Sequence, residues 1–158
     1  MTAEDIEFEY LLRGIADDPK CQEMKKYVQH SDVSTFDHCM DVARKSFHFV
    51  RKFHIKCDER ALVVGAFLHD YYLYDWHTYG DHLHGYHHAD RALFNALRDF
   101  EIEEKVQGII FSHMWPLNLT RVPGSGEALI VCMIDKIVSA KETLHRPREI
   151  KEEDEKYV

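Results

Sequence analysis

An adjacent histidine and aspartate, His69 and Asp70, close an apolar run that begins at Ala61. The run ALVVGAFL leaves no polar stripe on a helix, so we expect this segment to be buried on all sides. A carboxylate removed from water without a partner costs several kcal/mol or more, and such groups are usually paired, hydrogen-bonded or bound to a metal ion. Other parts of the chain must therefore supply partners for this pair.

Three further polar residues are predicted to face the core from different helices. His38 lies at the edge of an apolar arc, His113 continues the stripe formed by Ile102, Val106, Ile109 and Ile110, and Asp135 stands alone inside ALIVCMIDKIVSA. Imidazole and carboxylate ligands without thiolate suit Fe, Mn, Zn, Co, Ni or Mg rather than a structural cysteine-zinc site. Bound divalent metal would neutralise both buried aspartates.

The elements that must position these residues all read as helices. Amphipathic spacing predicts a helix over 35–53, in which Ser34 and Asp37 resemble a capping box. Asp58 is placed to cap the helix that carries His69, and the last helix is predicted over 127–146.

The connecting segments are less regular. The first 30 residues predict one or two short amphipathic helices, with Pro19 in the first turn of the second. Residues 71–87 are crowded with aromatics and histidines and read as a long loop, followed by a helix over 88–100 and another from about 102 to before Pro116. No alternating strand pattern stands out, so the expected fold class is all-α, a single-domain helical bundle.

Composition limits the function classes. A chain of 158 residues is most simply one domain, and its net charge of −8, with a pI near 5.8, argues against a general nucleic-acid or membrane surface. The four cysteines have no Cys-x-x-Cys spacing and read as reduced thiols of a cytoplasmic protein, and neither an export signal nor a membrane span is visible. The twelve histidines are the compositional outlier.

The order of these residues resembles the HD-domain phosphohydrolase superfamily. Its pattern is a histidine, a downstream His-Asp pair after an apolar helix, and a distant aspartate in another helix; here it falls on His38 in TFDHCMDVA, His69 and Asp70 in GAFLHDYY, and Asp135 in CMIDKIV. The resemblance spans about residues 35–145. The stretches HDYYLYDWH and SHMWPL look like a small bacterial single-domain subgroup of this superfamily.

The resemblance implies a ligand set for one or two divalent metal ions. Members with two metals add a histidine that opens a helix and another that ends the next helix, which match His88 and His113, with His84 and His87 as rivals for His88. One metal would be held by His38, His69, Asp70 and Asp135, and Asp70 would bridge to a second held by the two added histidines.

The implied activity is hydrolysis of a small phosphomonoester, nucleotide or phosphodiester by attack of a metal-bound hydroxide, with Asp70 and His69 as the catalytic pair. Lys136 and Arg121 are candidates to contact phosphate, as are His84 and His87, although surface charges are common at such positions. The Gly-Tyr-Pro motif of the cyclic-dinucleotide branch is missing, and Leu73 stands where many relatives carry a lysine. Hydrolysis of cyclic dinucleotides is therefore not expected.

Two other classes of function remain open. A metal- or nucleotide-binding sensor on the same fold would keep the ligands without turnover, and a metal-free helical interaction module would leave Asp70 and Asp135 stranded in apolar surroundings. In either enzyme or sensor we expect an N-terminal helical extension over 1–34, an HD domain over 35–146 and a charged tail over 147–158. The sequence does not give the oligomeric state.

Overall fold

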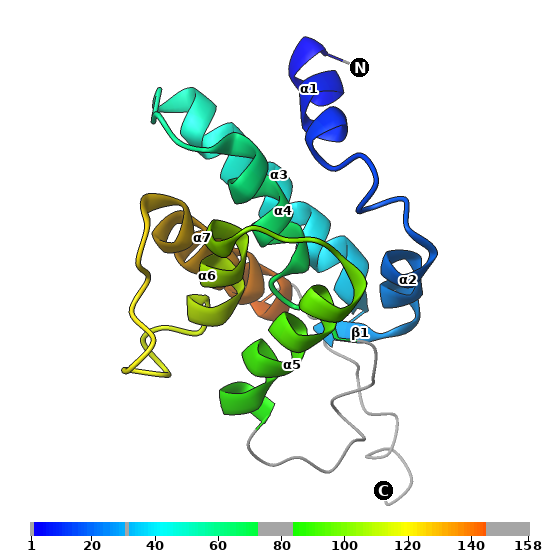
Figure 1. Cartoon of the computed structure of the whole chain (residues 1–158), viewed down its shortest axis with the longest axis vertical. Coiled ribbons are helices and arrows are strands. Elements are labelled where there is room, and N and C mark those ends of the chain that lie inside the picture. The colour runs from blue at the N-terminus through cyan, green and yellow to red at the C-terminus, as the bar shows by residue number, and fades with distance from the viewer. Residues whose placement is uncertain (1, 31, 73–83, 145–158) are drawn as a thin grey trace, which may run out of the picture.

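The computed structural model describes residues 2–30, 32–72 and 84–144 of the chain, which fold into a mostly helical single domain (Figure 1). The helices in these ranges are α1 (Ala3–Leu11), α2 (Pro19–Gln22), α3 (Thr35–Lys52), α4 (Glu59–Leu68), α5 (His84–Asp99), α6 (Glu104–Ser112) and α7 (Gly126–Leu144). A 3₁₀ turn, η1 (Glu23–Lys26), and an antiparallel hairpin of β1 (Val28–His30) and β2 (Val33–Ser34) lie between α2 and α3.

The predicted caps set the starts of the two helices that lead into the histidine cluster. The Ser34 hydroxyl accepts a hydrogen bond from the Asp37 backbone N–H at 3.1 Å, and the Asp58 carboxylate accepts one from the Ala61 N–H at 3.0 Å. Each cap satisfies a backbone donor that the first helical turn leaves without an intrahelical acceptor.

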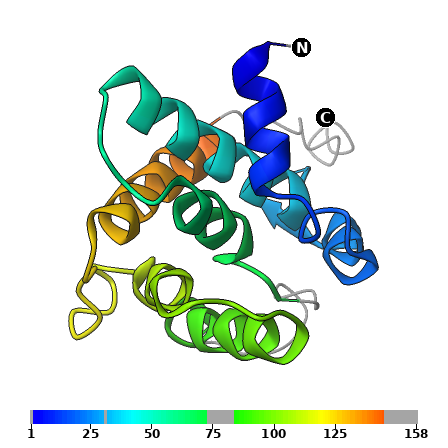
Figure 2. The ribbon, with the colours of Figure 1, turned by 45° about the horizontal axis from the view of Figure 1, so that its top comes forward.

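Helix α4 is the central element. Every residue from Ala61 to Leu68 is buried, as the unbroken apolar run predicted. Figure 2 shows α4 between α3 and α7 on one side and α5 and α6 on the other, and it packs against all four. Gly65 allows α4 and α6 to pack closely, because a Cβ atom at this position would lie 2.7 Å from the side chain of Ile109 in α6.

The N-terminal segment packs on the same body as the rest of the chain. The Phe8 ring of α1 lies 5.7 Å from the Phe47 ring of α3, and Arg44 donates a hydrogen bond to Asp5. The hairpin is joined to α3 by the Thr35 N–H, which donates to the Tyr27 carbonyl at 2.8 Å.

The structure differs from the sequence-based expectation at the hairpin and at the start of α5. The hairpin was not predicted, because strands of three and two residues are too short to show an alternating pattern. Helix α5 begins at His84 rather than His88, since Gly85 in a first turn weakens the sequence signal without preventing the helix. Helix α6 ends at Ser112, before Pro116 as predicted.

Two expectations concern residues outside the described ranges. Most of the predicted loop, residues 73–83, and the predicted tail over 147–158 fall there. Among the described helices, none combines the length and apolar composition that crossing a membrane requires. The four cysteines are free thiols, with Cys21, Cys39 and Cys132 buried.

A candidate metal centre

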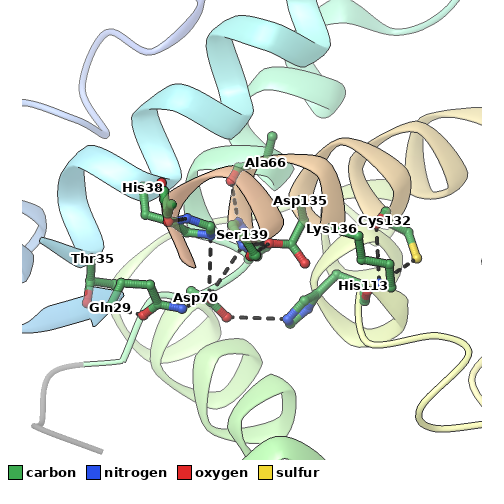
Figure 3. A network of polar contacts seen from close by, with 12 residues as sticks. Gln29, Thr35, His38, Ala66, Asp70, His113, Cys132, Asp135, Lys136 and Ser139 are labelled. Carbon is green, nitrogen blue, oxygen red and sulfur yellow. Dashed lines mark hydrogen bonds and ion pairs between the residues drawn. The ribbon is translucent and has the colours of Figure 1, made fainter. Parts of the chain in front are cut away.

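Five elements bring six of the sequence-predicted residues to one place, and Figure 3 labels His38, Asp70, His113 and Asp135 among them. The residues are His38 near the start of α3, His69 and Asp70 at the end of α4, His88 in α5, His113 at the end of α6 and Asp135 in α7. All six are buried. The prediction that His38, His69, Asp70, His113 and Asp135 face the core is therefore confirmed.

One half of the cluster lies between α3, α4 and α7. The Nε2 atoms of His38 and His69 lie 3.2 and 3.5 Å from Oδ1 of Asp135. The same two nitrogens lie 3.9 and 3.4 Å from Oδ2 of Asp70. Two imidazoles and two carboxylates from distant parts of the chain thus surround a common point.

The other half lies between α4, α5 and α6. The Nε2 atoms of His88 and His113 are each 3.3 Å from Oδ1 of Asp70, and they are 2.9 Å from each other. Asp70 therefore turns one carboxylate oxygen toward each half of the cluster.

The contacts of Nδ1 show that Nε2 is the ring nitrogen that can act as a metal ligand in His69 and His113. Nδ1 of His69 lies 2.7 Å from the carbonyl oxygen of Ala66, and Nδ1 of His113 lies 2.7 Å from that of Ile110. A carbonyl oxygen can only accept, so each Nδ1 carries the hydrogen, and in a neutral ring Nε2 then presents a lone pair. This is the tautomer that binds a metal through Nε2.

His38 reaches the same state through a carboxylate. Its Nδ1 lies 2.9 Å from Oε2 of Glu142, an oxygen that can only accept when ionised. A histidine that donates to a carboxylate on one side and faces a ligand position on the other is a common arrangement in metal sites.

Two buried polar atoms of the cluster have no hydrogen-bond partner among the described residues, although buried polar groups usually have one. These atoms are Nε2 of His69 and Oδ1 of Asp70, whose ion-pair neighbours lie within 3.5 Å. A lone pair that faces carboxylate oxygens is repelled by them unless a proton or a cation lies between. The residues therefore fit a divalent cation.

The donor atoms form two overlapping groups of three that could hold metal ions. One consists of His38, His69 and Asp135, and the other of His69, Asp70 and His113; within each group the ligand atoms lie within 4.8 Å of one another. Nitrogen and oxygen donors of this kind suit several divalent metals, so the ligands do not select one metal.

The backbone adds to the negative potential of the site. His69 and His113 are the C-cap residues of α4 and α6, so two helix C-termini end at the cluster. The unpaired carbonyls of a helix C-terminus carry partial negative charge and favour cations. The helix C-termini and the carboxylates therefore both favour a bound cation.

The pKa values of His38 and Asp135 shift as expected for close opposite charges. Burial disfavours a charged imidazole, but hydrogen bonds to Asp135 and Glu142 outweigh burial and raise the pKa of His38 to about 10. Burial also disfavours the charged Asp135, yet the hydrogen bond from His38 and the close contact with His69 hold the pKa of its carboxyl well below the usual range.

The pKa values of His69 and Asp70 shift in the same directions as those of His38 and Asp135. Burial opposes both charges, while the attraction between His69 and Asp70 raises the pKa of the imidazole and holds the pKa of the carboxyl well below its usual range. His113 is the exception, because burial outweighs its contact with Asp70 and lowers its pKa.

The other sequence-predicted candidates are His84, His87, Lys136 and Arg121. His87 is exposed, so His88 and not His87 joins the cluster from α5, and the side chain of His84 lies outside the described part of the chain. Lys136 donates hydrogen bonds to the backbone carbonyls of His113 and Cys132, at 2.8 and 3.2 Å. Lys136 thus caps the C-terminal end of α6.

Arg121 is also engaged by protein groups. It donates a hydrogen bond to Asp90 at 2.9 Å, and its guanidinium lies 4.3 Å from the centre of the Phe111 ring. Arg121 thus forms an ion pair with Asp90.

Two residues that contact the cluster were missed by the sequence reasoning. Glu142 follows Asp135 by seven residues, which is two helical turns and thus the same face of α7, so spacing could have revealed it. Gln29 donates to Oδ2 of Asp70 at 2.6 Å, and nothing in its sequence context indicates this contact.

The two tyrosines after the His-Asp pair are anchors of the fold. Tyr71 and Tyr72 are fully buried, and their hydroxyls donate to Asp99 and Gln29. Their neighbours Tyr74 and Trp76 lie outside the described residues.

Comparisons with known proteins give no family: no family model, no curated protein and no solved structure matches this chain. What the chain itself shows is a mostly helical protein with a buried cluster of histidines and aspartates that could bind metal.

Proposed function

We propose that this protein is a metal-dependent phosphoric ester hydrolase of the HD-domain type, acting on a small phosphomonoester, nucleotide or phosphodiester. The observation that carries the proposal is the set of buried Nε2 lone pairs that converge on Asp70 and Asp135, with Nδ1 of His38, His69 and His113 each held by an oxygen acceptor. Histidine and carboxylate donors without thiolate are typical of catalytic rather than structural metal sites.

The positions of the donors support two cations. His38, His69 and Asp135 would hold one, His88 and His113 would hold the other, and Asp70 would join them through its two oxygens. Cations held in this way would generate a nucleophile from water at neutral pH and stabilise the charge on the leaving oxygen of a phosphate ester. In a chain of net charge −8, they would also supply the positive centre that a phosphate requires.

The test is turnover of generic phosphate esters by the purified chain. We expect hydrolysis of p-nitrophenyl phosphate or bis(p-nitrophenyl) phosphate in the presence of added Mn²⁺, Fe²⁺, Co²⁺, Ni²⁺ or Mg²⁺, and loss of that activity in Asp70→Asn. Asp41→Asn is the matched control, because Asp41 pairs with Lys45 on the surface of α3, away from the cluster. Equal activity in wild type and Asp70→Asn would contradict the proposal.

A non-catalytic metal sensor is the second candidate, favoured by the burial of the cluster. Relative exposures of 3% for Asp70 and 7% for Asp135 leave little ligand surface open to a substrate. Metal binding without turnover of any phosphate ester in a broad metabolite screen would support the sensor over the hydrolase.

A further inference from the structure

A buried glutamine from the N-terminal hairpin touches the carboxylate at the centre of the cluster. Gln29 in β1 is 7% exposed, and its Nε2 donates to Oδ2 of Asp70 at 2.6 Å. Figure 3 shows Gln29 approaching Asp70 from the β1 side, opposite to His113. The segment before α3 thus contributes a polar group to the site.

The orientation of this amide follows from its neighbours. An ionised carboxylate can only accept, so the nitrogen of Gln29 must face Asp70 and its Oε1 must face away. On that side, the hydroxyl of Tyr72 donates to Oε1, and the Thr35 hydroxyl lies 3.5 Å from it. Tyr72 and Gln29 therefore form a directed chain of donors that ends on Asp70.

This chain determines which way the Asp70 carboxylate faces. Each carboxylate oxygen offers about two lone-pair sites, and the Gln29 amide occupies one on Oδ2. Oδ1 has no hydrogen-bond partner among the described residues and lies 3.3 Å from Nε2 of both His88 and His113. If the Gln29 hydrogen bond were lost, the carboxylate would be free to rotate away from these histidines.

We propose that Gln29 is a positioning residue that holds Asp70 across both halves of the cluster, so that the cation between His88 and His113 depends on Gln29 more than the other cation does. The inference rests on the proposed two-metal site. The difference follows from ligand number, because one half has His38, His69 and Asp135 besides Asp70, whereas among the described residues the other half has His88 and His113 besides Asp70.

The experiment is a Mn²⁺ titration of the metal-free full-length chain, followed by calorimetry and by electron paramagnetic resonance. Wild type is expected to bind two Mn²⁺ ions and to show the signal of an exchange-coupled pair. In Gln29→Leu, the weaker site should lose about 10–100-fold in affinity, as is typical when a residue that orients a ligand is removed. The other site should change by a smaller factor, and the coupled signal should vanish at Mn²⁺ concentrations that saturate wild type.

Gln22→Leu is the matched control. Gln22 is another partly buried glutamine of the N-terminal segment, and its Nε2 donates to the Ala16 carbonyl at 2.7 Å, so its loss removes a comparable hydrogen bond without touching Asp70. Tyr72→Phe is a second test that keeps Gln29 in place: without the hydroxyl the amide is less firmly oriented, and the weaker site should lose affinity by a smaller factor than in Gln29→Leu.

The outcomes separate this inference from the proposed function. Equal weakening of both sites, or Mn²⁺ affinities in Gln29→Leu and Tyr72→Phe that match those of Gln22→Leu, would overturn the role of Gln29 and leave the metal site intact. A wild-type chain that binds a single Mn²⁺ ion would also overturn it. A wild-type chain that binds no divalent metal would refute the proposed function itself.

Discussion

At the scale of single residues, the cluster uses one local arrangement twice. His69 and His113 each follow an apolar helix as its C-cap, and each donates Nδ1–H to the carbonyl three residues earlier. The last turn of a helix has carbonyls without intrahelical donors, so the histidine satisfies one of them while its Nε2 points onward. Burial of these histidines was predictable from the apolar stripes; the direction of Nε2 was not.

Glu142 provides a test of how the ligand side chains are oriented. In Glu142→Gln the acceptor for Nδ1 of His38 is neutral and weaker, so we expect affinity for Mn²⁺ or Zn²⁺ to fall about 10-fold or more. Equilibrium metal titration measures the change, with the exposed Glu104→Gln on α6 as control. Unchanged affinity in Glu142→Gln would show that this carboxylate has no part in the site.

At the scale of the elements, the close contact between α4 and α6 places His69 and His113 together. A Cβ atom on Gly65 would meet three atoms of Ile109 at 2.7–2.9 Å, one of them the Cβ of Ile109, so the helices would have to move apart. The rings of His69 and His113 are 4.9 Å apart, so a shift of either helix changes the geometry of the cluster.

We therefore expect Gly65→Ala to lower the free energy of unfolding by about 1–3 kcal/mol, the usual cost of overpacking. Gly108→Ala is the matched control on α6, where an added Cβ meets nothing within 4 Å. It should raise the free energy of unfolding by about 0.5–1 kcal/mol, because alanine loses less backbone entropy in a helix. Urea unfolding of the two variants measures both, and equal effects would argue against the close approach.

Asp99 joins α5 to α2 and to Tyr71. Its carboxylate accepts hydrogen bonds from Arg98, Lys20 and Tyr71, and the contact with Arg98 is the main cause that holds the pKa of Asp99 well below its usual range. A carboxyl whose pKa is lower in the folded state stabilises the fold above its unfolded pKa of about 4. That contribution is lost as the pH falls below this value.

The pH dependence follows with a definite sign. The difference in unfolding free energy between wild type and Asp99→Asn should be constant from neutral pH to about pH 5 and should shrink as the pH falls below about 4. Denaturant unfolding at a series of pH values measures it, with the exposed Asp17→Asn as control. A difference that does not change down to pH 3 would be inconsistent with this role of Asp99.

The helices with long apolar patterns could be predicted from the sequence, whereas short or irregular elements could not. Helices α3, α4, α6 and α7 have long apolar patterns, and the caps Ser34 and Asp58 mark two of their starts. The hairpin is too short for a periodic signal. The start of α5 was missed because Gly85 and the surrounding aromatics resemble a loop.

Some residues of the candidate site could also be predicted from the sequence, and others could not. Polar residues at inward positions of apolar helices, such as His38 and Asp135, stand out in the sequence because their burial needs a partner. Gln29 does not stand out, because it gains its role from a tertiary contact, and Glu142 is marked only by its spacing of seven residues from Asp135. Hydrogen-bond partners of ligands depend on helix packing, which periodicity alone does not supply.

At the scale of the whole molecule, an acidic chain concentrates buried carboxylates at the meeting point of its helices. The net charge is −8, and Asp70, Asp135 and Glu142 all have a carboxylate oxygen within 3.9 Å of a ring nitrogen of His38. Divalent cations that bind the folded state should therefore stabilise the whole fold, because the unfolded chain does not hold these ligands together.

We expect Mn²⁺ at about 100 times its dissociation constant to add about 3 kcal/mol to stability, which raises the melting temperature of a chain of this size by about 5–10 °C. A chelator should reverse the increase, and Asp135→Asn should show a much smaller one. Thermal unfolding followed by circular dichroism measures the shift. The same shift in wild type and Asp135→Asn would place the stabilising metal elsewhere.

The claim that buried histidines and aspartates hold divalent cations is tested most directly by anomalous diffraction from crystals grown with millimolar Mn²⁺ at neutral pH. The expected result is an anomalous peak about 2.0–2.2 Å from Nε2 of His38 and His69 and from a carboxylate oxygen of Asp135. The contradictory result is an ordered cluster closed by direct hydrogen bonds between histidine and aspartate, with no anomalous peak among them.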